Sequence, residues 1–189
     1  MKGSIKSLSV FFCLCLSCTL AAKPLNAQNP VRYGDWATQA IKGPEGRLYE
    51  ASTKGILDNL EEAVLSVHRS GENCGLLYLR FFFAYNNPAQ YNVDAMELTA
   101  NLTIDDGDLH TVVYEYHSRI GDRLVQLVIA QPPKHDEFFQ ELKFGEKMRA
   151  VVFINGGMEG VSFSLDGSFD AIEKTRSLCI NAQASKVGR

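Results

Sequence analysis

Residues 96–105, MELTANLTID, alternate strictly between apolar and polar side chains. Successive side chains of a β-strand point to opposite faces, so this pattern predicts a strand with one buried and one solvated face. Asp106 and Gly107 follow directly, and residues 109–117 resume the alternation. An Asp-Gly pair between two alternating runs is typical of a β-hairpin, with Gly107 accepting the positive φ of the turn. The segment therefore constrains the chain to antiparallel β-structure.

The same period of two recurs along most of the chain. We expect further strands at residues 35–41, 47–53, 75–85, 123–130, 147–154 and 161–165. Residues 56–67 also fit helical spacing, but residues 63–69 fit a strand that pairs with residues 75–85, and we favour the strand. Sequential strands joined by short turns predict a mainly β fold: an antiparallel β-sandwich or meander with one or two short helices.

Two segments have helical spacing instead. Residues 135–144 should form a helix that ends at Gly145, a residue suited to the left-handed conformation after a helix. Residues 169–181 should form a C-terminal helix with Ser168 as its N-cap. Cys179 follows Ile172 by two helical turns, so both should face the protein, while residues 182–189 are predicted to be a frayed tail.

The N-terminal segment has the features of a secretory signal peptide. Lys2 and Lys6 precede an uncharged apolar run, and Ala27 offers a small residue for cleavage. We therefore predict a signal peptide at residues 1–27 and one β-rich domain at residues 28–189, periplasmic or secreted. A buried N-terminal helix and a lipoprotein anchor at Cys18 are the alternatives.

The net charge of the chain argues against nucleic acid as a partner. The predicted leader holds three of the 19 Lys and Arg residues and none of the 22 acids, so the mature chain would carry a net charge of −6. Nucleic-acid binding requires clustered basic residues, and this chain has no basic stripe. After removal of the leader no second long apolar run remains, so we expect no transmembrane segment. No sequence feature specifies an oligomeric state.

The mature chain keeps two cysteines, Cys74 and Cys179. In an oxidising compartment they most simply pair with each other. Two buried free thiols are the alternative. A metal site is disfavoured because no C-x-x-C motif or neighbouring His pair supplies further ligands.

The sequence lacks a convergent catalytic set. The four histidines form no H-E-x-x-H motif and are predicted to be surface or rim residues, and we expect no catalytic residues, cofactor or metal, and no enzymatic activity. A small hydrolase using His135, Asp136 or Glu137 is the weaker alternative. Trp36 is predicted to anchor the core, although Trp36, Tyr114 and Tyr116 are also candidates for a binding surface, where aromatic side chains are over-represented.

Several short motifs together resemble one known family. The predicted leader is followed by Gly34-Asp35-Trp36, and a cysteine lies beside a turn at Glu72-Asn73-Cys74. The chain closes with an F-x-L-x-G-x-F-x-A-I segment that runs into a helical cysteine: Phe163, Leu165, Gly167, Phe169, Ala171, Ile172 and Cys179. This pattern resembles the invasion-associated locus B type of exported bacterial protein. The resemblance implies a small periplasmic or surface β-sandwich without enzymatic activity, linked in some members to host-cell entry.

The main functional hypothesis from the sequence is a non-enzymatic exported protein that binds another protein in the periplasm or at the cell surface. An inhibitor or immunity protein that uses an acidic surface to block a basic partner is the alternative.

We predict a Cys74–Cys179 disulfide in protein purified from the periplasm without reductant. The expected intact mass is that of the oxidised chain, with no increase after alkylation unless a reductant is added. A mass matching two free thiols would contradict the pairing.

Overall fold

The computed structural model describes residues 30–43, 46–57, 62–84, 88–129, 134–154 and 157–187. The predicted signal peptide, residues 1–27, lies outside the described residues. Within the described ranges no helix combines the length and apolarity needed to cross a membrane.

Across these ranges the chain forms ten strands and two helices. In chain order they are β1 (Val31–Tyr33), β2 (Trp36–Gly43), β3 (Gly46–Leu57), β4 (Glu62–Ser70), β5 (Tyr78–Ala84), β6 (Val93–Ile104), β7 (Leu109–Ser118), β8 (Leu124–Ile129), α1 (His135–Phe144), β9 (Lys147–Ile154), β10 (Gly157–Ser164) and α2 (Ser168–Val187). The fold is thus mainly β with two helices, one of them C-terminal, as predicted.

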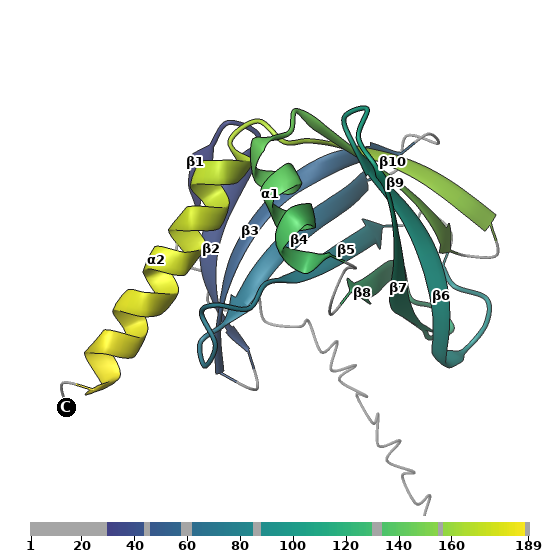
Figure 1. Ribbon diagram of the computed structural model, residues 1–189. Helices are drawn as coiled ribbons and strands as arrows, with labels where there is room; N and C mark the ends of the chain where they lie inside the picture. The colour runs from purple at the N-terminus through teal and green to yellow at the C-terminus, as the bar shows by residue number, and fades with distance from the viewer. Residues whose placement is uncertain are drawn as a thin grey trace, which may run out of the picture.

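The strands close into a barrel (Figure 1). Eight antiparallel strands follow the order β3, β10, β9, β6, β7, β8, β5 and β4, and β4 pairs with β3 again. The prediction of a sandwich or meander was therefore wrong. Strands of a sandwich and of a barrel alternate in the same way, so the pattern does not reveal whether a sheet closes on itself.

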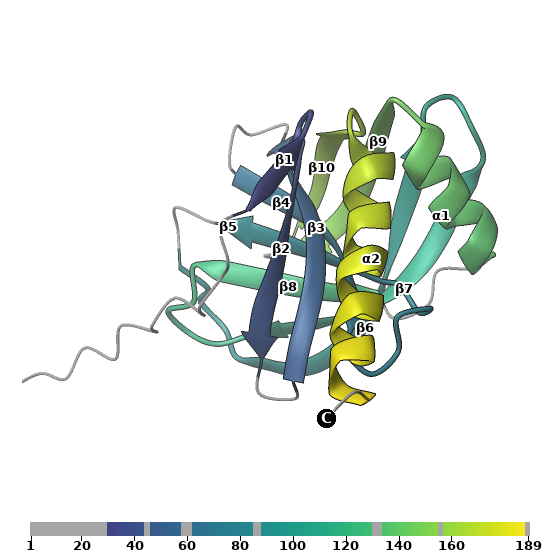
Figure 2. The ribbon, with the colours of Figure 1, turned by 90° about the vertical axis from the view of Figure 1, so that its left-hand side faces the viewer.

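Closure depends on the length of β3. One edge of β3 pairs with β4 from Leu48 to Ile56. The other edge is shared, because its first part pairs with β2 and Gly55, Ile56 and Leu57 pair with β10. The hairpin of β1 and β2 consequently lies outside the ring, and α2 runs along β2 and β3 (Figure 2).

The inward side chains of the strands form the main core together with α1. Phe138, Phe139 and Leu142 of α1 are fully or almost fully buried in the same cluster as the barrel residues. The ring of His110, at the start of β7, meets Phe138 edge-on with 5.1 Å between centroids. Helix α1 therefore lies across the end of the barrel where β6 ends and β7 begins (Figure 1).

Most predicted elements are present. Residues 63–69, for which a strand was favoured over a helix, lie within strand β4. The turn between β6 and β7 differs in one detail, because Asp105 adopts the left-handed φ of 49° and Gly107 does not. The amide of Gly107 donates to the carbonyl of Ile104 at 2.9 Å. The carboxylate of Asp105 accepts the amides of Glu146 and Lys147, which accounts for an acid at this position.

The helix ends differ from the predictions in three respects. Gly145 has φ −75° and ψ 171°, an extended conformation and not the predicted left-handed one. A glycine is required there because a Cβ would lie 2.6 Å from Cγ2 of Ile104. The hydroxyl of Ser168 donates to the carbonyl of Lys143 at 3.1 Å instead of capping α2. Residues 182–187 are helical rather than frayed, because Gln183 donates to the carbonyls of Gly71 and Glu72.

The disulfide predicted between Cys74 and Cys179 is present in the structure. It joins the loop before β5 to α2 across a sequence separation of 105 residues. A loop of this length would contribute about 4–5 kcal/mol in the chain-entropy model. Ala40 and Tyr49 pack with both cysteines in a second small core between α2 and the outer part of the sheet.

Tyr114 closes a gap in the barrel wall. Strands β6 and β9 pair only from Asn101 to Ile104, and Phe153 lies beyond that ladder. The hydroxyl of Tyr114 donates to the carbonyl of Phe153 at 2.6 Å and accepts its amide at 3.0 Å. Burial raises the pKa of Tyr114, so the hydroxyl stays protonated and available as a donor.

We predict that Tyr114→Phe lowers the free energy of unfolding by about 1–3 kcal/mol, because it leaves two backbone groups without their partner. Urea denaturation followed by circular dichroism measures the change. Tyr91→Phe, at an exposed position, is the control and should leave the midpoint unchanged. Equal midpoints for both variants would contradict the role assigned to the hydroxyl.

Candidate functional site

Two of the short motifs noted in the sequence contact each other. The amide of Asp35, between β1 and β2, donates to the carbonyl of Asp166 at 3.1 Å. The indole of Trp36 donates to the carbonyl of Ser164 at 3.0 Å. The Gly34-Asp35-Trp36 turn is thereby bonded to the segment that leads from β10 into α2.

A glycine from each motif makes this contact possible. Gly34 has φ +53° and Gly167 has φ +84°, conformations that other L-residues rarely adopt. A Cβ on Gly167 would lie 1.9 Å from the carbonyl oxygen of Tyr33, and one on Gly34 would lie 2.5 Å from the carboxylate of Asp166. The backbones touch with no room for a side chain.

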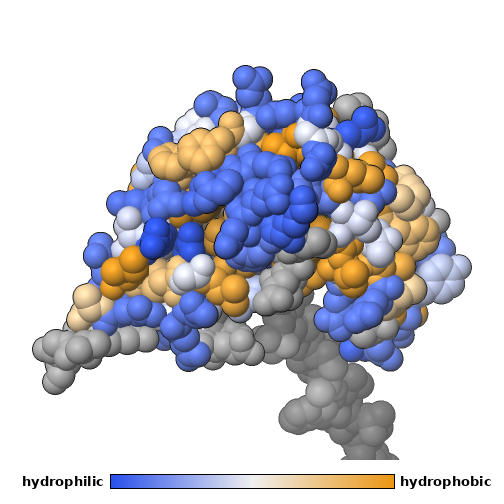
Figure 3. Space-filling model, in the orientation of Figure 1, coloured by the Kyte–Doolittle hydropathy of each residue, from blue (hydrophilic) through white to orange (hydrophobic). Residues whose placement is uncertain are grey.

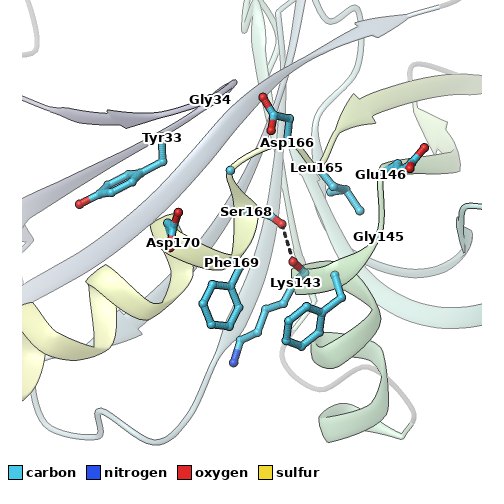
Figure 4. Close-up of a pocket in the computed structure, with 12 residues that line it drawn as sticks. Tyr33, Gly34, Lys143, Gly145, Glu146, Leu165, Asp166, Ser168, Phe169 and Asp170 are labelled. Atoms are coloured by element: carbon cyan, nitrogen blue, oxygen red, sulfur yellow. Dashed lines mark hydrogen bonds between the residues drawn. The ribbon is translucent and has the colours of Figure 1, made fainter.

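The C-terminal end of α1 is bonded to the same place. The Ser168 hydroxyl binds the Lys143 carbonyl, and the amide of Leu165 donates to the carbonyl of Glu146 at 2.9 Å (Figure 4). The β1–β2 turn, the end of α1 and the start of α2 therefore form one connected unit, which we call the helix junction: residues 33–35, 143–146 and 165–170.

An ion pair stabilises the two helices beside the junction. Nζ of Lys143 lies 2.6 Å from Oε1 of Glu173, and Arg176 lies 4.0 Å from the other carboxylate oxygen. The hydrogen bond from Lys143 is the main cause that holds the pKa of Glu173 below its usual value. The carboxylate of Glu173 is therefore charged at neutral pH.

A buried arginine links α2 to the barrel further along the helix. Arg69 of β4 donates to the carbonyl of Cys74 at 2.6 Å and to the hydroxyl of Thr175 at 3.2 Å. Burial lowers the pKa of Arg69, while the charge of Glu173 acts in the opposite direction. The disulfide and this arginine thus hold the middle of α2 at one position on the sheet.

The solvent side of the helix junction is a shallow cleft of about 640 Å³ (Figure 4). Phe144 is the last residue of α1 and Phe169 lies in the first turn of α2, and their rings pack with 5.2 Å between centroids. Phe144 is 68% exposed and Phe169 is 43% exposed. We call these two side chains the aromatic pair. In the space-filling view, apolar atoms emerge among hydrophilic ones near the start of α2 (Figure 3).

Three carboxylates line the same cleft as the aromatic pair. Asp166, Asp170 and Glu146 are exposed residues of the same cleft, and Asp170 extends between Tyr33 and Phe169 (Figure 4). The cation of the cleft, Lys143, is bound to Glu173. The cleft therefore combines two exposed aromatic rings with three exposed carboxylates.

The hydrolase alternative concerned His135, Asp136 and Glu137, which are not among the described residues that line the cleft. Across the described ranges no three His, Cys, Asp or Glu side chains come together as a metal site. His135 contacts the carbonyl of Leu77 and the ring of Phe139, whereas Asp136 and Glu137 are exposed, and Glu137 pairs with Lys134. Nδ1 of His135 lies 3.2 Å from Oδ1 of Asp136, but Glu137 pairs with Lys134 and does not join this contact.

The structure places several candidate residues differently from the sequence analysis. Trp36, Tyr114 and Tyr116 are buried, so they cannot form the exposed surface considered for them; all three belong to the main core. His68 and His110 are also buried rather than at the surface or rim. Burial, with a smaller effect of Arg80, lowers the pKa of His68 to about 4, so its imidazole is neutral at pH 7.

The aromatic pair was missed by the sequence analysis, although helix phase held a signal. The buried residues of α1 are Phe138, Phe139 and Leu142, and Phe144 lies about 200° around the helix from Leu142. A phenylalanine on the polar side of an amphipathic helix is a candidate contact residue. No comparable signal marks Phe169, which shares a helical stripe with Ile172 and Cys179.

Comparison with known proteins identifies one similar solved structure. No protein-family model matches the chain, and no curated protein matches it significantly. The crystal structure of invasion associated protein B from Bartonella henselae is 15% identical and aligns with 80% of this chain and 97% of that chain, with a TM-score of 0.49. This is a loose resemblance to the family that the sequence motifs indicated.

We predict that Gly167→Ala lowers the free energy of unfolding by more than about 2 kcal/mol, because it adds a steric clash to left-handed strain. Gly121→Ala is the matched control, because Gly121 has φ +92° and nothing within 4 Å of its would-be Cβ. Chemical denaturation gives the free energy of unfolding of both variants. The loss for Gly121→Ala measures the backbone strain alone, and any larger loss for Gly167→Ala measures the steric clash. Equal losses would show that the contact between Tyr33 and Gly167 is unimportant.

Proposed function

We propose that this chain is a non-enzymatic exported protein that binds another protein through the helix junction. The aromatic pair is the observation that supports this proposal. Exposed aromatic side chains supply much of the binding energy in protein interfaces, especially at the centre of a contact surrounded by polar groups. Phe144 and Phe169 are exposed and packed against each other, and Asp166, Asp170 and Glu146 line the same cleft.

The rigidity of the junction also supports a binding role. Each phenylalanine follows a residue that is bonded across the junction: the carbonyl of Lys143, before Phe144, accepts the hydroxyl of Ser168, before Phe169. A partner would therefore meet side chains already held in place, which lowers the entropy lost on association.

The proposed location is the periplasm or the cell surface. Disulfides persist in oxidising compartments and are rare in the cytosol, so the Cys74–Cys179 bridge supports export. The predicted signal peptide agrees with this location. Contact with a host cell is the setting implied by the resemblance to invasion-associated proteins.

An inhibitor or immunity protein is a second candidate, favoured by the exposed carboxylates of the cleft. Such a protein would bind a basic partner, and its association rate would fall steeply as salt is added. A partner recognised mainly through Phe144 and Phe169 would show a weak salt dependence. The salt dependence of the association rate therefore distinguishes the two candidates.

Photo-crosslinking tests the proposed surface. A benzophenone amino acid at position 144 or 169 should give one discrete adduct with a periplasmic or host-cell protein, and the same probe at Ile180 should not. Ile180 is a matched control because it is exposed on the same helix as Phe169.

We predict that the double variant Phe144→Ser, Phe169→Ser weakens binding of the crosslinked partner by roughly 30-fold or more, the effect of losing an interface hot spot. Surface plasmon resonance with the purified partner measures the loss, and unchanged thermal unfolding shows that the variant folds. Absence of an adduct at both positions, or equal adducts at position 180, would reject the helix junction as the binding surface.

A further inference from the structure

The exposed carboxylates in the cleft of the helix junction lack cationic partners. Asp166, Asp170 and Glu146 line the cleft, and no cation in the described part of the chain forms an ion pair with any of them. Lys143, the cation among the described lining residues, pairs with Glu173. The cleft therefore carries negative charge that the chain itself does not compensate.

The start of α2 does not cancel this charge. The N-terminus of a helix contributes a partial positive charge equivalent to about half an elementary charge. Asp170 lies in the first turn of α2, so its own carboxylate offsets that partial charge. Asp166 and Glu146 lie between elements, before α2 and after α1 respectively. The cleft consequently remains negative, and charge complementarity favours a cationic group in it.

The aromatic pair narrows the kind of cation. A guanidinium group can stack on an aromatic face while its N–H groups donate to a carboxylate, whereas an ammonium group is a compact and strongly hydrated charge. Asp170 extends between Tyr33 and Phe169, so one side chain entering there would meet both a carboxylate and aromatic rings (Figure 4). Arginine therefore fits the cleft better than lysine.

A second hollow adjoins the cleft at the end of α1. It has a volume of about 410 Å³, and Phe144 and Gly145 line both it and the cleft. Its other lining residues are Ile104, Asp105, Gly107 and Glu141. Because the two hollows share residues, a partner segment that covers Phe144 can place side chains in both.

The carboxylates of the second hollow already have partners. Asp105 accepts two backbone amides, at 2.8 and 3.0 Å, and an oxygen of Glu141 lies 2.7 Å from Nε2 of His110. An apolar side chain that contacts Ile104 and Phe144 leaves these bonds intact. A cation there would have to compete with them, so the second hollow favours an apolar group.

The charge of the cleft disfavours a second copy of this chain seated cleft to cleft. A two-fold symmetric contact places the same surface of both copies together. The carboxylates of one copy would then face those of the other, and like charges across an interface oppose association. The occupant is therefore a segment of different chemistry.

We infer that the partner of the helix junction presents an arginine side chain to the cleft and an apolar side chain to the second hollow. The inference rests on the proposed function and names the chemistry of the partner at that site. The arginine stacks on Phe169 and pairs with Asp170, while the apolar side chain contacts Ile104 beside Phe144. A single guanidinium adds only one screened charge, which agrees with recognition mainly through the aromatic pair.

The test titrates the disulfide-bonded mature protein, labelled with nitrogen-15, with the acetylated and amidated peptides SGRGLGS and SGLGRGS, which cover both chain directions. We expect saturable shifts of the amide resonances of Gly145 and Asp170 with at least one peptide. Replacing its arginine by citrulline, which has the same shape without the charge, should weaken binding by about fivefold or more. No saturable shift with either peptide, or equal affinities of the arginine and citrulline forms, overturns the inference.

Matched variants locate the arginine. Asp170→Asn should weaken the arginine peptide by about fivefold and leave the citrulline peptide unchanged. Asp136→Asn is the control, because Asp136 also lies in the first turn of a helix but does not line the cleft, and it should change neither affinity. Thermal unfolding verifies that both variants fold. An unchanged affinity of Asp170→Asn, or an equal loss in both variants, contradicts the assigned site.

Two further outcomes separate this inference from its alternatives. A dimer in sedimentation velocity that the variant Phe144→Ser, Phe169→Ser abolishes would assign the cleft to a second copy and overturn the inference. Crosslinks at positions 144 and 169 report a protein partner whatever its contact residues are. An adduct without peptide binding would therefore retain the proposed function and reject the arginine, so the two failures are distinguishable.

Discussion

The position of β3 in the sheet is the constraint on which the rest of the structure depends. One edge of β3 pairs with β4, and the other is divided between β2 and β10. The three pairs with β10 close the barrel, and the bond from Trp36 to Ser164 secures the adjacent hairpin to the end of β10. Without this division the β1–β2 hairpin would have no place outside the ring, and α2 would have no surface on which to lie.

The two helices pack against different parts of the closed barrel. Helix α1 buries one apolar face against an end of the barrel, whereas α2 lies on the outer sheet, where Ala171 and Ile172 join the main core and Cys179 joins the second one. The disulfide, the bonds of Arg69 and the contacts of Gln183 hold α2 along its length. Two helices with different supports thereby meet at one point and expose Phe144 and Phe169 together.

The candidate surfaces were less predictable than the elements that carry them. Trp36, Tyr114 and Tyr116 attract attention as binding residues by type, yet packing places all three in the core. Phe144 and Phe169 are ordinary helix residues until the ends of the two helices are brought together.

Local patterns by themselves predicted most strands, most turns, both helices and the pairing of Cys74 with Cys179. These features depend on side-chain period, on turn residues and on a count of two thiols, all of which are readable along the chain. Tertiary structure alone decided that the sheet closes, that Asp105 rather than Gly107 takes the positive φ, and that Gly34 and Gly167 are required. The physical reason is that each depends on contact between segments far apart in sequence, for which local periodicity carries no information.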